Sequence, residues 1–320
     1  MSAGDVNADG VDGVDGADGS DGADGSERLD EAYHVERPGA DLYVEQAGPP
    51  RAAPVYYLHG GPGYHAHSFR ELVGDDLEAY RMIYADQRGG GRSYADRPFD
   101  LDVLADDVAA VLQALARESP PWDGGVTLLA HGFGAVIAVR AGLRHPQWVT
   151  RLVLVNPWFS MPMLARTLQR SAALQSDQTD AALPPEAALA DPSAIDPDEL
   201  VDSAFSWVSA KQLFDRLEFT HPAARMRLEH ADSTVLLGPH ATAELERPWH
   251  ADVLAELGDL SCDVIVLVGT RDGTAFPDQV EAGLARLPQA LSGLLETGHY
   301  PWLDDPDAFL ELLHDALARA

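Results

Sequence analysis

The chain has 320 residues, 46% of them hydrophobic and 23% charged, and it carries a formal net charge of −30. This length accommodates one large α/β domain or two smaller ones, and the strongly negative charge argues against nucleic acid or anionic membranes as partners. A single cysteine, Cys262, excludes an intramolecular disulfide and a thiolate metal cluster, and no apolar run is long enough for a membrane span.

Residues 1–28 form an acidic low-complexity segment in which Asp and Gly recur every third residue. This repeat superficially resembles a calcium-binding array. However, it lacks the glycine-rich nonapeptide of calcium β-rolls and the bidentate glutamate that ends a calcium loop. We therefore predict a disordered acidic tail, with order beginning near Tyr33. The first residues also lack a basic-then-apolar signal, so we expect a cytoplasmic protein.

Short strands and helices alternate along residues 29–157, the first part of the expected core. Apolar runs bounded by turn residues predict six strands, and amphipathic spacing predicts three helices. The expected strands are 33–35, 42–45, 54–58, 81–85, 126–130 and 151–155, and the expected helices are about 69–79, 101–117 and 135–143.

The alternation lapses over residues 158–257, which are rich in Ala, Leu, Asp and Pro and show helical spacing without a convincing strand. This pattern predicts a helical cap inserted after the sixth strand. Alternation resumes in residues 258–320, the second part of the core. We therefore expect an α/β fold with a mostly parallel central sheet and helices on both faces. The remaining expected elements are strands at 263–268 and 291–296 and helices at 278–286 and 306–318.

The segment around residues 126–145 places a tight turn between a strand and a helix. The turn, Ala130 to Gly134, has almost no side-chain bulk. A strand that turns sharply into a helix over small residues is the setting of the nucleophile elbow, G-x-S-x-G. In this alignment Gly134 matches the last glycine and Ala130 replaces the first. Gly132 therefore stands where the nucleophilic serine is expected.

Two other candidate residues directly follow predicted strands. Asp272 lies in the turn after the strand that ends near Val268, and His299 lies in the turn after the strand that ends near Glu296. Each has an ordinary explanation as a turn or loop residue. Together with the elbow, however, they follow the α/β-hydrolase order of elbow, acid and histidine.

These motifs resemble the α/β-hydrolase superfamily, and specifically its prolyl-iminopeptidase-like branch. His59-Gly-Gly-Pro-Gly63 matches the oxyanion-loop motif of that branch, and Asp86-Gln-Arg-Gly89 followed by Gly91-Arg-Ser93 matches its second signature. The resemblance extends from about Tyr33 to Ala320. It implies that Asp272 is the triad acid and His299 the triad base. It also implies that the backbone N–H groups of Gly61 and Phe133 form an oxyanion hole.

The chain departs from this branch in two respects. Gly132 has no nucleophilic atom, so no acyl-enzyme can form at that position, although glycine accepts the backbone angles of the elbow without strain. Ser93 and Cys262 are weaker candidates for a nucleophile, and we expect the side chain of His131 to point away from position 132. In addition, prolyl iminopeptidases hold the free amino group of the substrate with acids of the cap. The sequence does not locate such acids here, and Trp207 fits a cap helix or ordinary packing equally.

Three hypotheses follow. The chain is an enzyme that uses a His299–Asp272 dyad and an oxyanion hole on a small, mainly apolar ester, amide or carbonyl substrate, with hydrolysis, lyase or cyclase-type chemistry all open. Alternatively, Gly132 replaces the nucleophile of an ordinary serine hydrolase, by nature or by design. In the third hypothesis the chain is a binding protein without catalysis.

No cofactor or metal is implied, because the glycine spacings match no dinucleotide or phosphate loop and no His/Asp/Glu cluster has metal-site spacing. The expected partner is a small-molecule substrate.

Overall fold

The computed structural model describes residues 28–118, 125–176, 195–237 and 244–319. Apart from Arg28, the predicted acidic tail lies outside these residues. Among the described residues, no helix has both the length and the hydropathy needed to cross a membrane.

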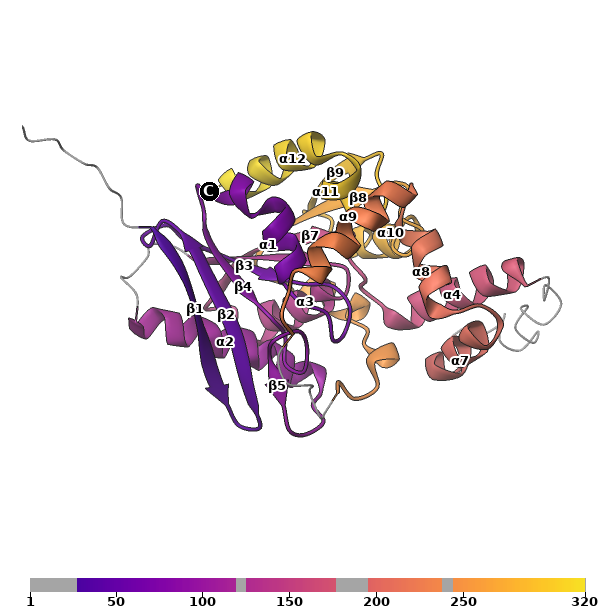
Figure 1. Cartoon of the computed structure of the whole chain (residues 1–320), viewed down its shortest axis with the longest axis horizontal. Helices are drawn as coiled ribbons and strands as arrows, with labels where there is room; N and C mark the ends of the chain where they lie inside the picture. The colour runs from indigo at the N-terminus through magenta and orange to yellow at the C-terminus, as the bar shows by residue number, and fades with distance from the viewer. Residues whose placement is uncertain (1–27, 119–124, 177–194, 238–243, 320) are drawn as a thin grey trace, which may run out of the picture.

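A nine-stranded, mostly parallel sheet runs through the described part of the chain (Figure 1). Its order is β1-β2-β4-β3-β6-β7-β8-β9, with β5 paired to β2. The pairs β1–β2, β2–β4 and β2–β5 are antiparallel, and the others are parallel. The strands are β1 (Leu29–Arg37), β2 (Ala40–Gly48), β3 (Pro54–Leu58), β4 (Arg81–Ala85), β5 (Tyr94–Ala95), β6 (Val126–His131), β7 (Val149–Val155), β8 (Asp263–Gly269) and β9 (Leu291–Leu295).

Helices cover both faces of this sheet because successive strand side chains point to opposite sides. In β3, Tyr56 and Leu58 pack into one apolar core, whereas Val55 and Tyr57 pack into the other. The first core is covered by α2 (Leu101–Glu118), α3 (Gly134–Arg144) and α10 (Asp278–Leu284). The second is covered by α1 (His67–Val73), α11 (Pro301–Asp304) and α12 (Pro306–Ala318). The predicted fold class is therefore confirmed.

The described residues between β7 and β8 are largely helical. In Figure 1, α4 and α7 lie together at the end of the molecule farthest from β1 and β2. Leu164 of α4 and Leu213 of α8 contribute to the first core, and Leu228 of α9 contributes to the second. The elements of this segment are α4 (Met161–Gln175), α7 (Pro197–Trp207), α8 (Ala210–Glu218), α9 (Pro222–Ser233), and the short 3-10 helices η3 (Pro248–His250) and η4 (Leu254–Asp259).

Several boundaries differ from those expected. β1 and β2 form a longer antiparallel pair than their apolar residues indicate, because backbone pairing continues through polar positions. The predicted helix at 69–79 is α1 followed by the 3-10 helix η1 (Gly74–Leu77). The two-residue β5 has no apolar pattern to reveal it. As a result, the helical segment follows the seventh strand of the structure rather than the sixth.

Parallel pairing brings the ends of the central strands together. Leu58 of β3 lies beside Ala130 of β6, and Val155 of β7 lies between His131 of β6 and Leu267 of β8. The loops that follow these strands therefore meet at one edge of the sheet, where ligands of such sheets bind.

Candidate functional site

The turn after β6 has the backbone of a nucleophile elbow. Gly132 has a φ of 52°, in the left-handed region that glycine tolerates best. Its N–H donates to the carbonyl of Val155, and its carbonyl accepts from the N–H of Trp158. A Cβ at Gly134 would approach the Leu58 carbonyl oxygen to 2.3 Å, so that position requires glycine for the helix to pack on β3.

His299 and Asp272 meet beside this elbow. Nδ1 of His299 is 2.8 Å from Oδ2 of Asp272, and both residues are only 1% exposed. Nε2 of His299 faces position 132: a Cβ built on Gly132 would lie 3.0 Å from that nitrogen. The chain thus brings three of its predicted site residues together, and no group of the described residues hydrogen-bonds to the imidazole nitrogen that faces the glycine.

Thr274 holds Asp272 in place. Oδ1 of Asp272 accepts hydrogen bonds from the backbone N–H of Thr274, at 2.8 Å, and from its hydroxyl, at 2.6 Å. The same hydroxyl accepts from Nε1 of Trp158 at 2.9 Å. The Trp158 ring stacks on the imidazole of His299 at a centroid distance of 5.1 Å. Trp158 therefore fixes the carboxylate through Thr274 and covers one face of the base.

Two further side chains hold the backbone of His299. Asn156, which follows β7 with a φ of 44°, donates from Nδ2 to the carbonyls of Gly298 and His299 and accepts from the N–H of Gly269. His131 lies under the dyad, with Nε2 2.8 Å from the same His299 carbonyl. Because a carbonyl only accepts, His131 donates from Nε2.

The pKa values of these histidines move in opposite directions. Burial alone would lower the pKa of His299, but the charge of Asp272, the hydrogen bond to it and the nearby Glu218 together raise that pKa above its ordinary value. Burial and the neighbouring His299 push the pKa of His131 well below its ordinary value. His299 is therefore the more basic of the two histidines, and His131 is neutral.

The expected oxyanion loop follows β3 and is held from beneath by His59. Burial lowers the pKa of His59 to about 4, so its ring is neutral at pH 7. Nδ1 contacts the Gly60 carbonyl, and Nε2 accepts from the N–H of Gln87 at 2.9 Å. Among the described residues, the N–H groups of Gly61 and Phe133 donate to no protein acceptor.

The second signature ties neighbouring loops together. Asp86 accepts from the N–H of Ala66 and from both the backbone and the guanidinium of Arg92. Although burial would raise the pKa of Asp86, these bonds and the charge of Arg92 hold it below its ordinary value. The Ser93 hydroxyl donates to the Asp86 carbonyl and accepts from the N–H of Tyr43. Ser93 is therefore a structural residue in this loop.

Cys262 is also unsuited to act as a nucleophile. It directly precedes β8, at the end of that strand opposite the loop that carries Asp272. Burial raises the pKa of its thiol to about 11, so the thiol stays protonated at neutral pH.

A cavity of about 470 Å³ opens over the dyad. Its walls are mainly apolar and include Trp158, Phe214 and Trp249, and Glu218 is the acid among the described residues that line it. Trp207 does not line this cavity; it ends α7 and packs against the first apolar core. The described part of the helical segment therefore supplies apolar side chains and one acid to the wall of this cavity.

Sequence reasoning missed four residues of this site: Asn156, Trp158, Thr274 and Glu218. Asn156 carried a usable signal, since it is a polar residue directly after a predicted buried strand. The other three are ordinary in sequence, and only the fold brings them to the dyad.

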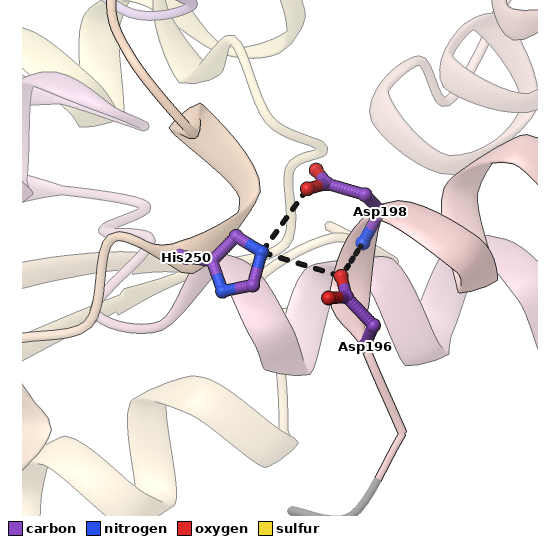
Figure 2. Close-up of side chains that lie close together, drawn as sticks. All are labelled: Asp196, Asp198 and His250. Atoms are coloured by element: carbon purple, nitrogen blue, oxygen red, sulfur yellow. Dashed lines mark hydrogen bonds and ion pairs between the residues drawn. The ribbon is translucent and has the colours of Figure 1, made fainter.

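Outside the dyad, Asp196, Asp198 and His250 form a cluster that sequence spacing does not reveal. Figure 2 shows the imidazole directed at both carboxylates, with Nε2 of His250 3.3 Å from Asp196 and 3.1 Å from Asp198. One oxygen from each aspartate and a ring nitrogen lie within 4.8 Å of one another. Asp196, however, caps α7 by accepting from the N–H of Asp198, and a guanidinium nitrogen of Arg247 lies 2.9 Å from the same Nε2. The cluster is thus accounted for as a link between α7 and η3.

Comparison with known proteins identifies a family and several proteins that are similar to this chain. Residues 53–306 match the family described as alpha/beta hydrolase fold. The chain is 26% identical over 275 residues to a proline iminopeptidase of Heyndrickxia coagulans, covering 82% of this chain and 90% of that protein. It is also 26% identical over 273 residues to a putative carbamate hydrolase of Agrobacterium fabrum, covering 80% of this chain and 90% of that protein.

A solved structure gives the same result. The crystal structure of a proline iminopeptidase-related protein from Thermus thermophilus superposes with a TM-score of 0.74 and 36% identity, covering 90% of this chain and 97% of that one. The mostly parallel sheet with helices on both faces agrees with these similarities. The chain therefore belongs to the α/β-hydrolase family, in its proline-iminopeptidase-like branch.

Proposed function

We propose that this protein is an α/β-hydrolase-fold enzyme that acts on a small, mainly apolar ester, amide or carbonyl substrate through His299 and Asp272, without a serine nucleophile. The observation that carries this proposal is the 3.0 Å separation between Nε2 of His299 and the Cβ position of Gly132. An oxygen of water, or of an acidic substrate group, placed beside Gly132 lies within hydrogen-bond reach of the base.

For an ester or amide, His299 accepts a proton from water through Nε2 while the water oxygen attacks the carbonyl carbon. The resulting imidazolium is stabilised by Asp272 through Nδ1–H. In this proposal the N–H groups of Gly61 and Phe133 stabilise the oxyanion, helped by the N-terminus of α3. A positioned base contributes about 10²–10⁴-fold, and a single oxyanion donor about 10²–10³-fold. These factors are large enough for useful turnover without an acyl-enzyme.

The test is turnover of short-chain esters and of proline arylamides by the wild type and by His299→Ala. We expect the variant to lose about 10²–10⁴-fold in kcat/KM. His34→Ala is the matched control, because His34 lies on the outer strand β1 and is about half exposed. Unchanged turnover in His299→Ala in every assay would exclude catalysis by the dyad and favour a binding protein.

The pH profile gives a second readout. Activity requires unprotonated His299, so it should fall as the pH drops through the raised pKa of that residue. Removing the charge in Asp272→Asn leaves burial as the main influence, and the acidic limb should therefore move to lower pH along with a loss of rate. If the acidic limb of Asp272→Asn lies at the same pH as that of the wild type, a group other than His299 controls it.

A second candidate function is serine hydrolysis with the nucleophile replaced. It is favoured by the left-handed φ of Gly132 and by the approach of His299 to that residue, which suit a serine at the elbow. Gly132→Ser separates the two candidates. A large gain in ester turnover, with labelling by a serine-directed phosphonate, supports the replaced nucleophile. No gain, together with loss of native turnover, supports the dyad. We expect no phosphonate labelling of the wild-type elbow.

A further inference from the structure

Glu218 is an acid in the wall of the cavity that the dyad mechanism leaves unused. It is the last residue of α8 and is 8% exposed, and it lines the same cavity as His299. Among the described residues, no group hydrogen-bonds to its carboxyl oxygens, although neither oxygen is among the side-chain atoms that are both fully enclosed and unpartnered. Asp272, by contrast, accepts from both Thr274 and His299. A buried carboxyl without a partner is costly as an anion, so its position requires an explanation.

The end of α8 is hydrogen-bonded to the two loops that carry His299 and Asp272. The Glu218 carbonyl accepts from the backbone N–H of His299 at 2.8 Å, and the Leu217 carbonyl accepts from the N–H of Gly273 at 2.8 Å. Consecutive residues of α8 therefore bond to the loop that carries the base and to the loop that carries its acid. These hydrogen bonds fix the backbone of Glu218 beside the dyad.

The surroundings of Glu218 favour its neutral form. Burial raises the pKa of Glu218 to about 7, a protonated His299 opposes that shift, and the Asp272 carboxylate adds to it. The carboxyl also sits at the negative end of the α8 dipole. Asp215, its nearest acid on α8, is ion-paired with Arg225 of α9 at 2.7 Å. The titratable and charged groups that face Glu218 are His299, Asp272, Tyr300, Asp215 and Arg225.

We propose that Glu218 is a second catalytic group, a general acid that protonates the leaving group. This inference rests on the proposed function. His299 takes a proton from the attacking water as the new C–O bond forms. When the tetrahedral intermediate collapses, the bond from carbon to the leaving oxygen or nitrogen breaks, and that atom takes the proton of the Glu218 carboxyl. The proton that Nε2 took from water then passes to the Glu218 carboxylate, directly or through another water. Both groups regain their starting state, and the net reaction consumes one water.

The dependence on leaving group tests this role. We expect Glu218→Gln to lower kcat/KM about 10²–10⁴-fold for alkyl esters and arylamides, whose leaving groups need a proton. The decrease in kcat/KM should be much smaller for 4-nitrophenyl esters, because their leaving group departs as an anion and needs no proton. The variant should also lose the alkaline limb of the pH profile for alkyl esters. Glu199→Gln, an exposed acid in the first turn of α7, is the matched control and should leave both substrate classes unchanged.

Other outcomes would overturn the inference while leaving the proposed function standing. An equal loss for both ester classes would assign Glu218 to shaping the cavity. A rise in KM confined to substrates with a free amino group would assign it to binding that group. If His299→Ala has no effect, the proposed function fails and this inference fails with it.

An infrared titration provides a readout without turnover. The wild type should show a protonated-carboxyl C=O band at about pH 6 that is missing from Glu218→Gln and disappears as the pH rises. Complete ionisation of Glu218 at that pH would contradict the inference whatever the assays show.

Discussion

At the scale of single residues, the two glycines of the elbow have different roles. Gly134 is required because a side chain there would collide with the Leu58 carbonyl. Gly132 has a left-handed φ, and its Cβ position lies in contact with the base rather than with backbone. The turn thus keeps its shape without a serine, and what changes is the atom presented to His299. This is why the residues around position 132 are assembled although that position is a glycine.

Thr274 is the residue whose support of the dyad is easiest to test. Thr274→Val removes the hydroxyl that donates to Asp272 and leaves Nε1 of Trp158 without its acceptor. We expect the free energy of unfolding to fall by about 1–3 kcal/mol, because a buried donor is left unpaired, and kcat to fall as the carboxylate loosens. Chemical denaturation and ester turnover measure the two effects. Thr274→Ser keeps the hydroxyl and should recover most of both, and failure to do so would mean that packing of the methyl group dominates.

At the scale of elements, the sequence predicts most of the core because apolar runs and helical periodicity carry the signal. The strands at Pro54–Leu58 and Arg81–Ala85 and the helix at Pro306–Ala318 have the predicted boundaries. β5 and the polar ends of β1 have no such signal, since pairing alone defines them. The acid and the histidine can be placed because each directly follows a strand. Glu218 cannot, because its position depends on how α8 docks on the loops of the sheet.

The helical segment is also joined to the residues that follow the expected oxyanion loop, His59–Gly63. The Tyr64 hydroxyl donates to Asp232 of α9 at 2.5 Å, and Nε2 of His65 is 3.7 Å from the same carboxylate. His67 contacts Thr234 through Nε2 at 2.8 Å. The two histidines that follow the loop therefore contact α9 and the residue that ends it, and His65 is buried.

Tyr64→Phe should weaken this connection. Loss of a hydrogen bond to a charged group is expected to lower the free energy of unfolding by about 1.5–3 kcal/mol and to speed hydrogen exchange in α9 and in residues 60–64. Exchange followed by mass spectrometry measures the local effect. Tyr80→Phe is the matched control, since its hydroxyl contacts His314 on α12. Equal exchange in α9 for both variants would indicate that this hydrogen bond does not hold the helix.

At the scale of the whole molecule, a net charge of −30 means that repulsion between acids opposes the compact state. Raising the ionic strength from about 0.01 M to about 0.15 M shortens the Debye length from about 30 Å to about 8 Å. We expect the thermal midpoint to rise over this range, because repulsion among many exposed acids is screened more than the few buried ion pairs are. Calorimetry at constant pH, with a non-ionic osmolyte as control, measures the effect. A midpoint that falls with salt would show that surface ion pairs dominate.

The hydrogen bonds from Leu217 and Glu218 to the two dyad loops bear on how substrate enters and product leaves. If α8 swung outward to widen the chamber, it would pull on the backbone of His299 and Gly273 at the same time. Ligand exchange must therefore proceed around a stationary α8, or it must misalign the base while the chamber is open. In the second case the enzyme is idle whenever bulk solvent has free access, and it becomes competent only on closure.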